Sequence, residues 1–454
     1  MAGCLLVTAE RDCAVTAFEL GCLSLPFMLI LILLRVPVIL AMVGVGVAGQ
    51  YLILGSWTPF LAQLKHITYS TFSSYSLSVI PMFLLMGQFA TKGGLSRSLF
   101  AAANQLIGHR RGGIGLSAIA ACGGFGAICG SSLATAATMG QVALPELRKY
   151  GYSDRLSTAI LAAGGTLGVL IPPSVVLVIY AILTEQNIAK LFIAAFIPGF
   201  LAIFGYMATV WLWVRFGGEK NIKIAQKQDS QTAGALQAIW PVLAIFLLVI
   251  GGIYLGWFTP TEGAAVGACA TGILAYVNGG LTLTTFTEAL LETSQATAMI
   301  FAIIFGASIF NSFLAFSRLP FEAADYVSAL EASPYVILMI ILIAYLILGC
   351  FMDSLSMILL TIPVFFPVFQ TLDFGMDPEH AALWFGILVL IVVEVGLITP
   401  PVGLNLFVIN KLAKNVPLRE SFIGVLPFVC SDIIRIILLV CFPAICLFAV
   451  EILF

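Results

Sequence analysis

Long, nearly uninterrupted apolar runs dominate the chain and predict membrane-spanning helices. Apolar residues make up 61% of the 454 residues and charged residues only 9%. A soluble protein could not bury that much apolar surface, and a membrane barrel would show alternating segments of about 10 residues. We therefore expect an all-α polytopic membrane protein. The expected helical segments lie at about 20–36, 38–54, 78–107, 112–146, 157–180, 186–214, 239–258, 262–280, 296–316, 335–371, 382–410 and 421–451.

One apolar stretch, residues 112–146, has cations at both ends. His109–Arg111 precede it and Arg148–Lys149 follow it. Positive charge marks the cytoplasmic side of short loops, so both ends are expected on that side. The stretch is shorter than two crossings of about 20 residues each. We predict a re-entrant helical hairpin that enters from the cytoplasm and turns near Gly130–Ser132.

A polar stretch, residues 215–237, divides the chain near its middle and carries Arg215, Lys220, Lys223 and Lys227. The positive-inside rule makes it a cytoplasmic linker. It separates a first half at 22–214 from a second half at 238–454. Residues 1–21 show neither the cationic start nor the cleavage site of a signal peptide, so they are treated as a leader without an assigned role.

The two halves contain the same landmarks in the same order, which indicates an internal duplication. Three landmarks of the first half recur in the second half, 222 to 228 positions later. The segment Pro37–Gly44 corresponds to Pro260–Gly267. Ser132 and Pro145 correspond to Ser354 and Pro367, and Gly168 and Pro172–Pro173 correspond to Gly396 and Pro400–Pro401.

The charge pattern predicts that the duplication is inverted. The second hairpin, residues 340–371, has acidic flanks, and Arg318 is the nearest cation. The missing Lys and Arg place these flanks outside. One hairpin then opens from each face of the membrane, and both termini are expected outside.

Each half also carries two predicted helix breaks. One is the hairpin tip, at 129–132 and at 352–356; the other is a double proline within 157–180 and within 382–410. Consecutive prolines unwind a helix and free its carbonyl groups. Inverted repeats with broken helices are typical of secondary transporters, which bind substrate and ions near the bilayer midplane.

Freed carbonyls with Ser, Thr and Asn oxygens form a neutral oxygen cage that suits a monovalent cation such as Na⁺. Helix N-termini facing the same gap would attract an anionic group. Gly, Ser and Thr also serve simply as packing residues in membrane helices. Four breaks paired by symmetry favour a binding site over packing alone.

Two carboxylates lie deep in apolar sequence, where such groups are rare and usually functional. Asp353 stands at a predicted tip, which favours cation coordination or proton coupling. Glu394 is equally compatible with such a role and with a hydrogen bond to a neighbouring broken helix. Arg35 and Arg435 are expected to snorkel or to form pairs.

Three segments then carry a specific resemblance: GSSLATAATMGQVALPELRKYGY (130–152), GGTLGVLIPPSVVLVIY (164–180) and VEVGLITPPVGLNLFVIN (393–410). They resemble the large membrane subunit, the DctM-like M subunit, of tripartite ATP-independent periplasmic (TRAP) transporters. The resemblance runs from about residue 22 to the end and includes residues 258–268 and 349–368.

The resemblance implies a Na⁺-driven importer of organic anions such as C4-dicarboxylates or sialic acid, located in the bacterial inner membrane. It implies two partners, a small four-helix DctQ-like membrane subunit and a DctP-like periplasmic binding protein. It also implies an elevator-type mechanism with Na⁺ as coupling ion and no cofactor. A phosphate loop of the form GxxxxGK[ST] is absent from the sequence, which fits coupling to an ion gradient.

Carried onto matching positions, the resemblance also implies where the two Na⁺ ions and the substrate lie, and the individual ligands are inferred from composition and symmetry. No catalytic residue is expected. The first Na⁺ site would comprise Gly130, Ser131, Ser132, Thr166 and Gly168, and the second Asp353, Ser354, Ser356, Gly396, Thr399 and Pro401. The substrate would lie between the tips, at Ser132, Thr135, Pro173, Ser354, Gly403 and Asn405.

Three alternatives remain open at this point. A stand-alone sodium-coupled anion symporter could share the architecture, and a passive channel would need no gradient. An intramembrane protease would need a catalytic pair or HExxH. That motif is absent, and His66, His109 and His380 are all predicted in loops. The net charge of −2 gives no indication of a nucleic-acid partner.

Overall fold

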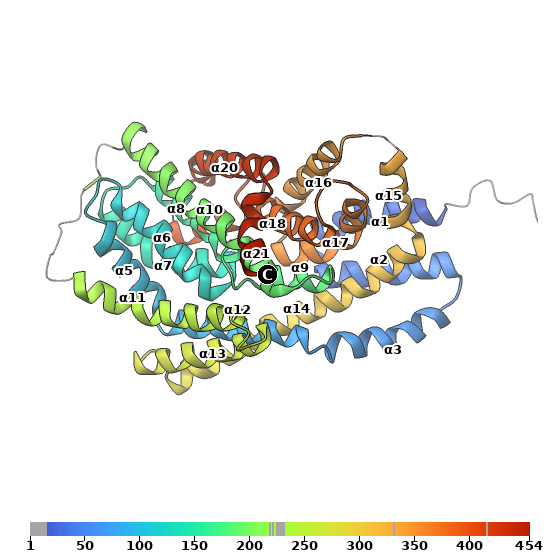
Figure 1. Cartoon of the computed structure of the whole chain (residues 1–454), viewed down its shortest axis with the longest axis horizontal. Coiled ribbons are helices and arrows are strands. Elements are labelled where there is room, and N and C mark those ends of the chain that lie inside the picture. Colours follow the sequence, from blue (N-terminus) through green and yellow to red (C-terminus); the bar gives the residue numbers. More distant parts are fainter. Residues whose placement is uncertain (1–15, 218, 220–221, 224–231, 330–331, 415) are drawn as a thin grey trace, which may run out of the picture. The chain divides into compact units, whose positions relative to one another are not determined.

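The computed structural model describes residues 16–217, 219, 222–223, 232–329, 332–414 and 416–454, and every regular element in these ranges is a helix (Figure 1). The all-α expectation is confirmed. Helices long and apolar enough to cross a bilayer are α10 (Ile188–Phe216), α14 (Leu283–Ser317), α18 (Pro378–Gly396) and α20 (Leu418–Cys441). The pair α8 (Asp154–Leu170) and α9 (Val175–Leu183) also qualifies, although it is bent by 44° at its break.

One compact unit contains α1 (Ala17–Leu33), α2 (Val38–Leu54), α3 (Thr58–Phe72), α14 from Ile300 onward, α15 (Leu319–Ala329) and the end of α17. Glycines let α2 pack directly on α14. A Cβ added at Gly46 would lie 3.0 Å from the Phe310 Cα, and one at Gly49 would lie 2.3 Å from the Phe313 ring. Small residues that permit such close approach are typical of helix interfaces in membranes.

The start of α1 falls inside the predicted leader. Residues 1–15 lie outside the described residues, but α1 begins at Ala17, so the last part of the range 1–21 is helical. Thr16 and Glu19 form a capping box in which each side chain accepts a hydrogen bond from the other residue's backbone N–H. This pattern satisfies N–H groups that the first helical turn leaves unpaired, which explains why the helix starts here.

The second compact unit contains the other elements and is the larger one. It comprises the short η1 (Ser76–Ser78), α4 (Val79–Lys92), α5 (Leu95–Ile107), α6 (Gly113–Cys129), α7 (Ser132–Lys149), α8, α9, α10, α11 (Thr232–Phe246), the π-helical η3 (Leu247–Gly251), α12 (Gly252–Tyr254), α13 (Pro260–Val277), the first part of α14, most of α16 (Pro334–Gly349), the first half of α17 (Ser354–Gln370), α18, α19 (Leu404–Ala413), α20 and α21 (Ala444–Leu453).

Helices α8 and α18 form the interior of this unit. Residues Leu156–Leu170 of α8 and Ala382–Gly396 of α18 are all buried. A helix that is apolar all round has no face suited to water and is expected in an interior. Helix α8 packs against α6, α7, α10, α19 and α20. The first segment of each broken helix therefore lies mostly in the core.

Several predicted segment boundaries were wrong. The segment 78–107 is two helices, because the chain turns at Gly93–Gly94, where Gly94 has φ +70°. The segment 296–316 is the later part of α14, which starts at Leu283, and 421–451 is interrupted before Ala444. Helix α3 was not predicted, since Lys65 and His66 made its sequence look polar.

The predicted linker 215–237 is shorter in the structure. Helix α10 continues to Phe216 and α11 begins at Thr232. Residues 218, 220–221 and 224–231 of that range lie outside the described residues.

Candidate functional site

The first hairpin turns at Gly130–Ser131, within the predicted range. Helix α6 ends where Gly130 adopts a left-handed conformation with φ +64°, which glycine reaches without a Cβ clash. Ser131 is extended and begins α7 as its N-cap, with its side-chain oxygen accepting a hydrogen bond from the Ala134 N–H at 3.4 Å. The helices α6 and α7 pack against each other, so Ser131 and Ser132 stand at the tip.

The second turn lies slightly earlier than predicted. Helix α16 ends at Gly349 and α17 begins at Ser354, so Ser354 and Ser356 lie in the first turn of α17. Asp353 caps this helix. Its carboxylate accepts from the Ser356 backbone N–H at 3.1 Å and from the Ser356 hydroxyl at 2.6 Å. Asp353 therefore fixes the shape of the tip.

Removing this cap should loosen the start of α17. We expect Asp353→Ala to lower the free energy of unfolding by about 1 kcal/mol. Asp353→Asn should lower it much less, because Asn is an equally good N-cap. Thermal unfolding in detergent measures the difference. The exposed Asp325 of α15 gives a control, Asp325→Ala. Equal melting temperatures for Asp353→Ala and the wild type would contradict the capping role.

Glycines bring the core helices into backbone contact with each hairpin. A Cβ at Gly126 of α6 would lie 2.7 Å from the Gly168 Cα of α8. A Cβ at Gly396 of α18 would lie 2.7 Å from the Gly349 Cα of α16. The second contact repeats the first at positions 223 and 228 residues further along the chain. The two halves thus use the same close approach.

Gly168 lies against the first tip. A Cβ there would be 2.4 Å from the Thr135 Oγ1 and 2.6 Å from the Ser131 carbonyl oxygen. The Thr135 hydroxyl is buried and has no hydrogen-bond partner among the described residues. Two oxygen atoms are therefore gathered at the point where α8 touches the tip.

The break between α8 and α9 also touches this tip. A Cβ at Gly130 would lie 3.0 Å from the Pro173 carbonyl oxygen. Ser174 then caps α9, accepting a hydrogen bond from the Leu177 N–H at 3.4 Å. The second break follows α18, and Gly403, with φ +63°, starts α19. The Pro172–Pro173 and Pro400–Pro401 peptide bonds are both cis.

Glu394 joins the two tips. This carboxylate of α18 is 1% exposed and accepts a hydrogen bond from the Ser354 hydroxyl at 2.7 Å. The Ser132 side chain of the first tip lies beside the same carboxyl group. The Glu394 Oε2 atom has no hydrogen-bond partner in the described part of the chain. A single side chain of the core therefore contacts the second tip directly and lies next to the first.

A buried polar network lies close to Glu394. The Tyr206 hydroxyl of α10 donates to the Asp432 Oδ2 at 2.8 Å, and Arg435 pairs with Asp432 at 2.8 Å. The Thr166 hydroxyl lies 3.0 Å from the Tyr206 hydroxyl. Of the two roles expected for Arg435, pairing and snorkelling to a surface, the structure shows the ion pair with Asp432. The side chain is 6% exposed and does not reach a surface. The network ties α8, α10 and α20 together.

The tips line one small cavity of about 80 Å³. The N-terminal ends of α7, α9 and α17 meet at this cavity. Helix N-termini carry unpaired N–H groups and partial positive charge. The lining residues are Leu84, Gly130, Ser131, Ser132, Leu133, Val169, Val175, Val176, Asp353, Ser354 and Leu355.

Only some of the predicted site residues reach this cavity. Five of them line it, namely Gly130, Ser131, Ser132, Asp353 and Ser354. Thr135, Gly168 and Pro173 lie directly behind the first tip.

The other predicted residues do not line this cavity. The Thr166 hydroxyl is directed to Tyr206, the Thr399 hydroxyl donates to the Val395 carbonyl at 2.6 Å, and the Asn405 amide donates to the Ala162 carbonyl at 3.4 Å. Gly396 contacts Gly349, Gly403 packs near Phe422, Ser356 bonds Asp353, and Pro401 is exposed.

Sequence reasoning missed the apolar lining and did not decide between ion or proton coupling and a hydrogen bond for Glu394; the structure shows the hydrogen bond. Val175 and Val176 gave no signal, because valine is unremarkable in a membrane helix. Glu394 did give one, as a carboxylate inside apolar sequence. The expected positions of two histidines were wrong: His66 lies in α3 and His380 in the first turn of α18, although His109 lies in a turn.

Hairpins and broken helices whose ends meet at a small cavity lined by serine hydroxyls and apolar side chains define a polytopic membrane transporter with discontinuous helices. The sequence profile of the family described as tripartite ATP-independent periplasmic transporter, DctM component, matches residues 25–445. The chain belongs to this family. It is the large permease subunit of a TRAP transporter, and thus a transport protein rather than an enzyme.

Relatives match over most of their length. The chain is 36% identical to the C4-dicarboxylate TRAP transporter large permease protein DctM of Pseudomonas aeruginosa, over 89% of this chain and 93% of that protein. It is 33% identical to the sialic acid TRAP transporter large permease protein SiaM of Vibrio cholerae, over 82% and 85%. It is 31% identical to the ectoine TRAP transporter large permease protein TeaC of Halomonas elongata, over 92% and 96%.

A solved structure shares the fold. The crystal structure of the Alcanivorax borkumensis YdaH transporter, described as having an unusual topology, superposes with a TM-score of 0.62 at 15% identity. The superposition covers 85% of this chain and 89% of that chain. At this level of identity the likeness concerns the fold alone.

Proposed function

We propose that the chain imports an organic anion across the bacterial inner membrane, driven by Na⁺. A periplasmic binding protein delivers the substrate, and a small membrane subunit completes the complex. The family's name describes a three-part transporter that does not use ATP. The absence of a phosphate loop from the sequence agrees with ion coupling.

The observation that carries this proposal is the meeting of three helix N-termini at one cavity. Helices α7, α9 and α17 all begin there, with Ser132, Val175 and Ser354 as their first residues. Their dipoles favour negative charge, and unpaired N–H groups can donate to carboxylate oxygens. Asp353, the acidic residue in the lining, is already bonded to Ser356. The cavity is thus suited to an anion.

The oxygen atoms behind the first tip support a Na⁺ site. The Ser131 carbonyl and the Thr135 hydroxyl face Gly168, and the Pro173 carbonyl faces Gly130. These are neutral oxygens of the kind that hold a hard cation, and unwound carbonyls serve this purpose in other transporters. Gly130, Ser131, Ser132, Thr166 and Gly168 are the proposed first site.

The second proposed Na⁺ site follows from the duplication. Gly349 and Gly396 repeat the backbone contact between Gly126 and Gly168. Its proposed residues are Asp353, Ser354, Ser356, Gly396, Thr399 and Pro401.

The proposed substrate is a carboxylate. C4-dicarboxylates, sialic acid and ectoine appear in the names of the relatives' transporters, and each of these compounds carries a carboxylate group. Ligand pockets usually measure about 300–1,000 Å³. A cavity of about 80 Å³ is too small for such a compound. The tips must therefore separate to admit substrate, as in an elevator-type cycle where hairpins and broken helices move together.

Uptake into liposomes tests the proposal. The chain is reconstituted with its small subunit and supplied with its loaded binding protein, with and without an inward Na⁺ gradient. Substrate should accumulate only with the gradient, which a passive channel would not require. Omission of the binding protein should abolish uptake, whereas a stand-alone symporter would remain active.

Ser132→Ala and Ser354→Ala should each raise the Na⁺ concentration for half-maximal uptake. The expected change is roughly 10- to 100-fold, because a hydrogen bond or ligand to a charged group contributes about 1.5–3 kcal/mol. Ser308→Ala is the matched control, since the Ser308 hydroxyl bonds only its own helix at the Ile304 carbonyl. Unchanged Na⁺ dependence in both tip variants would refute the tip assignment.

A further inference from the structure

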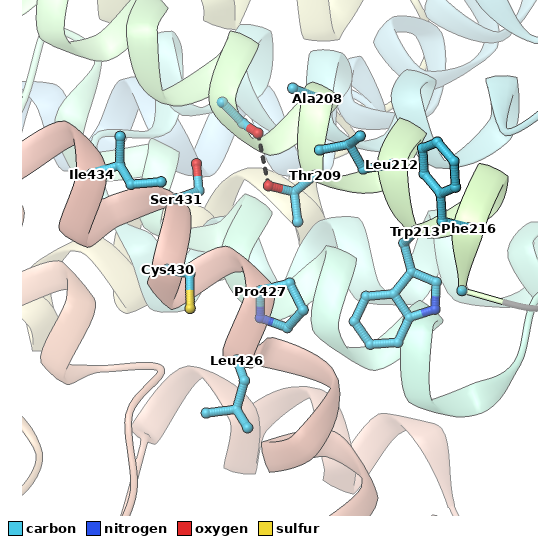
Figure 2. A pocket seen from close by; sticks show the side chains of 12 residues that line it. Ala208, Thr209, Leu212, Trp213, Phe216, Leu426, Pro427, Cys430, Ser431 and Ile434 are labelled. Carbon is cyan, nitrogen blue, oxygen red and sulfur yellow. Dashed lines mark hydrogen bonds between the residues drawn. The ribbon is translucent and has the colours of Figure 1, made fainter.

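An apolar groove of about 750 Å³ runs between α10 and α20, away from the tips (Figure 2). Figure 2 shows Ala208, Leu212 and Trp213 of α10 facing Pro427, Cys430 and Ser431 of α20 across it. The helices come together at one end, where a Cβ at Gly205 would lie 2.7 Å from the Ser431 Oγ. The lining residues are Gly205, Ala208, Thr209, Leu212, Trp213, Phe216, Gly217, Leu426, Pro427, Cys430, Ser431 and Ile434.

Two arginines lie near one end of this groove. The Arg155 guanidinium lies 5.5 Å from the Trp213 ring centroid, and the Arg215 guanidinium lies 5.7 Å from the Phe216 ring centroid. Both rings line the groove. Arg155 also adjoins α20, because a Cβ at Gly424 would lie 2.4 Å from the Arg155 carbonyl oxygen and 3.1 Å from its Cγ. The cations therefore flank an opening whose walls are apolar.

One donor of the Arg155 side chain has no partner in the described part of the protein. Its Nε atom is buried and lacks a hydrogen-bond partner among the described residues. The neighbouring acids are engaged elsewhere: Asp154 pairs with Arg148 at 2.7 Å, and Glu219 accepts a hydrogen bond from the Ser153 hydroxyl. A buried donor without a partner is costly, so an external acceptor at this position would be stabilising.

We propose that this groove binds one anionic phospholipid, with an acyl chain between α10 and α20 and the phosphodiester at Arg155 and Arg215. The phosphate oxygens accept hydrogen bonds from the two guanidinium groups, which match phosphate geometry well. Basic pockets between membrane helices on the cytoplasmic side are known to hold anionic lipid headgroups.

The dimensions and the side of the membrane agree with a lipid of the cytoplasmic leaflet. The groove extends along α10 from Gly205 to Gly217, a length of about 18 Å at 1.5 Å per residue. One leaflet of a hydrocarbon core about 30 Å thick is about 15 Å deep. The positive-inside rule places the start of α8 and the end of α10 in the cytoplasm. Trp213 and Phe216 then lie at headgroup depth, where aromatic residues anchor membrane proteins.

Native mass spectrometry of the full chain in detergent tests the proposal. The protein is titrated with phosphatidylglycerol and with phosphatidylcholine of identical acyl chains. We expect one phosphatidylglycerol to be retained in preference to phosphatidylcholine. Removing both guanidinium charges with Arg155→Gln and Arg215→Gln should lower its affinity about fivefold per arginine, or roughly 25-fold together. Arg110→Gln with Arg111→Gln, two exposed arginines at the start of the hairpin, is the matched control and should change nothing.

A second variant addresses the acyl chain independently of the charges. Ala208 is exposed and lines the groove, so Ala208→Trp fills it without disturbing the interior. This variant should lose bound lipid of both kinds. Equal retention of the two lipids by the wild type, or full retention by Ala208→Trp, would overturn the proposal. A third outcome would also overturn it. If the added small membrane subunit displaces the lipid and protects the thiol of Ala208→Cys from labelling, the groove is a protein interface.

Discussion

Gly126→Ala is expected to reduce Na⁺-driven uptake roughly 10- to 100-fold, a loss that corresponds to the 1–3 kcal/mol typical of overpacking. The added Cβ would lie 2.7 Å from the Gly168 Cα and 3.0 Å from the Leu167 carbonyl oxygen. Both are backbone atoms of α8, so neither can rotate away. The hairpin must shift, and with it Ser131 and Ser132 at the tip. Initial uptake rates in liposomes, normalised to inserted protein, measure the effect.

Gly124→Ala provides a control two residues away on the same helix. A Cβ there would meet only the Leu99 side chain at 3.4 Å, an ordinary contact. Alanine is also the better helix former, by about 1 kcal/mol. Uptake by this variant should stay near the wild-type rate. Gly396→Ala should behave like Gly126→Ala, because its Cβ would lie 2.6 Å from the Gly349 carbonyl carbon. Equal rates for Gly124→Ala and Gly126→Ala would mean that this backbone contact does not matter.

Glu394→Ala should reduce uptake by about 100-fold or more. The change leaves the Ser354 hydroxyl without its acceptor and opens a cavity beside both tips. Burying an unpaired hydroxyl costs about 1–3 kcal/mol, and the cavity adds to this. Glu394→Gln keeps an oxygen that can accept from Ser354 and keeps nearly the same volume. It should therefore retain at least about a tenth of the wild-type rate.

Comparing Glu394→Ala with Glu394→Gln separates the effect of the hydrogen bond to Ser354 from a general loss of folded protein. Glu451→Ala, at an exposed position of α21, is the control for removal of a carboxylate and should be neutral. A Glu394→Ala variant that transports at the wild-type rate would show that the tips need no link through α18.

The interruptions of the helices were predictable from the sequence because glycine and proline act locally. Gly130 is needed for a left-handed turn, and the double prolines cannot continue a helix, whatever surrounds them. The apolar helices and the tips at Ser132 and Ser354 follow from the same local rules. Asp353 was placed at a tip correctly, although it lies at the end of the turn 350–353, where it caps α17, rather than inside a tip at 352–356.

Features that depend on tertiary contacts could not be predicted. The contact of the Thr166 hydroxyl with the Tyr206 hydroxyl is one such feature, because Tyr206 lies 40 residues further along the chain. The link between Ser354 and Glu394 likewise spans 40 residues. Helix α3 was missed for a different reason: Lys65 and His66 lower its hydropathy, and a search for apolar runs does not detect such helices.

A disulfide cross-link decides whether the two tips meet beside Glu394. The ten native cysteines are replaced, Ser132→Cys and Ser354→Cys are introduced, and a protease site is inserted between the end of α10 and the start of α11. After oxidation in membranes and cleavage, a linked protein runs as one band and an unlinked protein as two. Gly205→Cys with Ser431→Cys joins the same two fragments and is the positive control. The contact with Glu394 predicts one band for the tip pair. Two bands for the tip pair, with one band for the control, would contradict the convergence of the tips on which the proposed transport function depends.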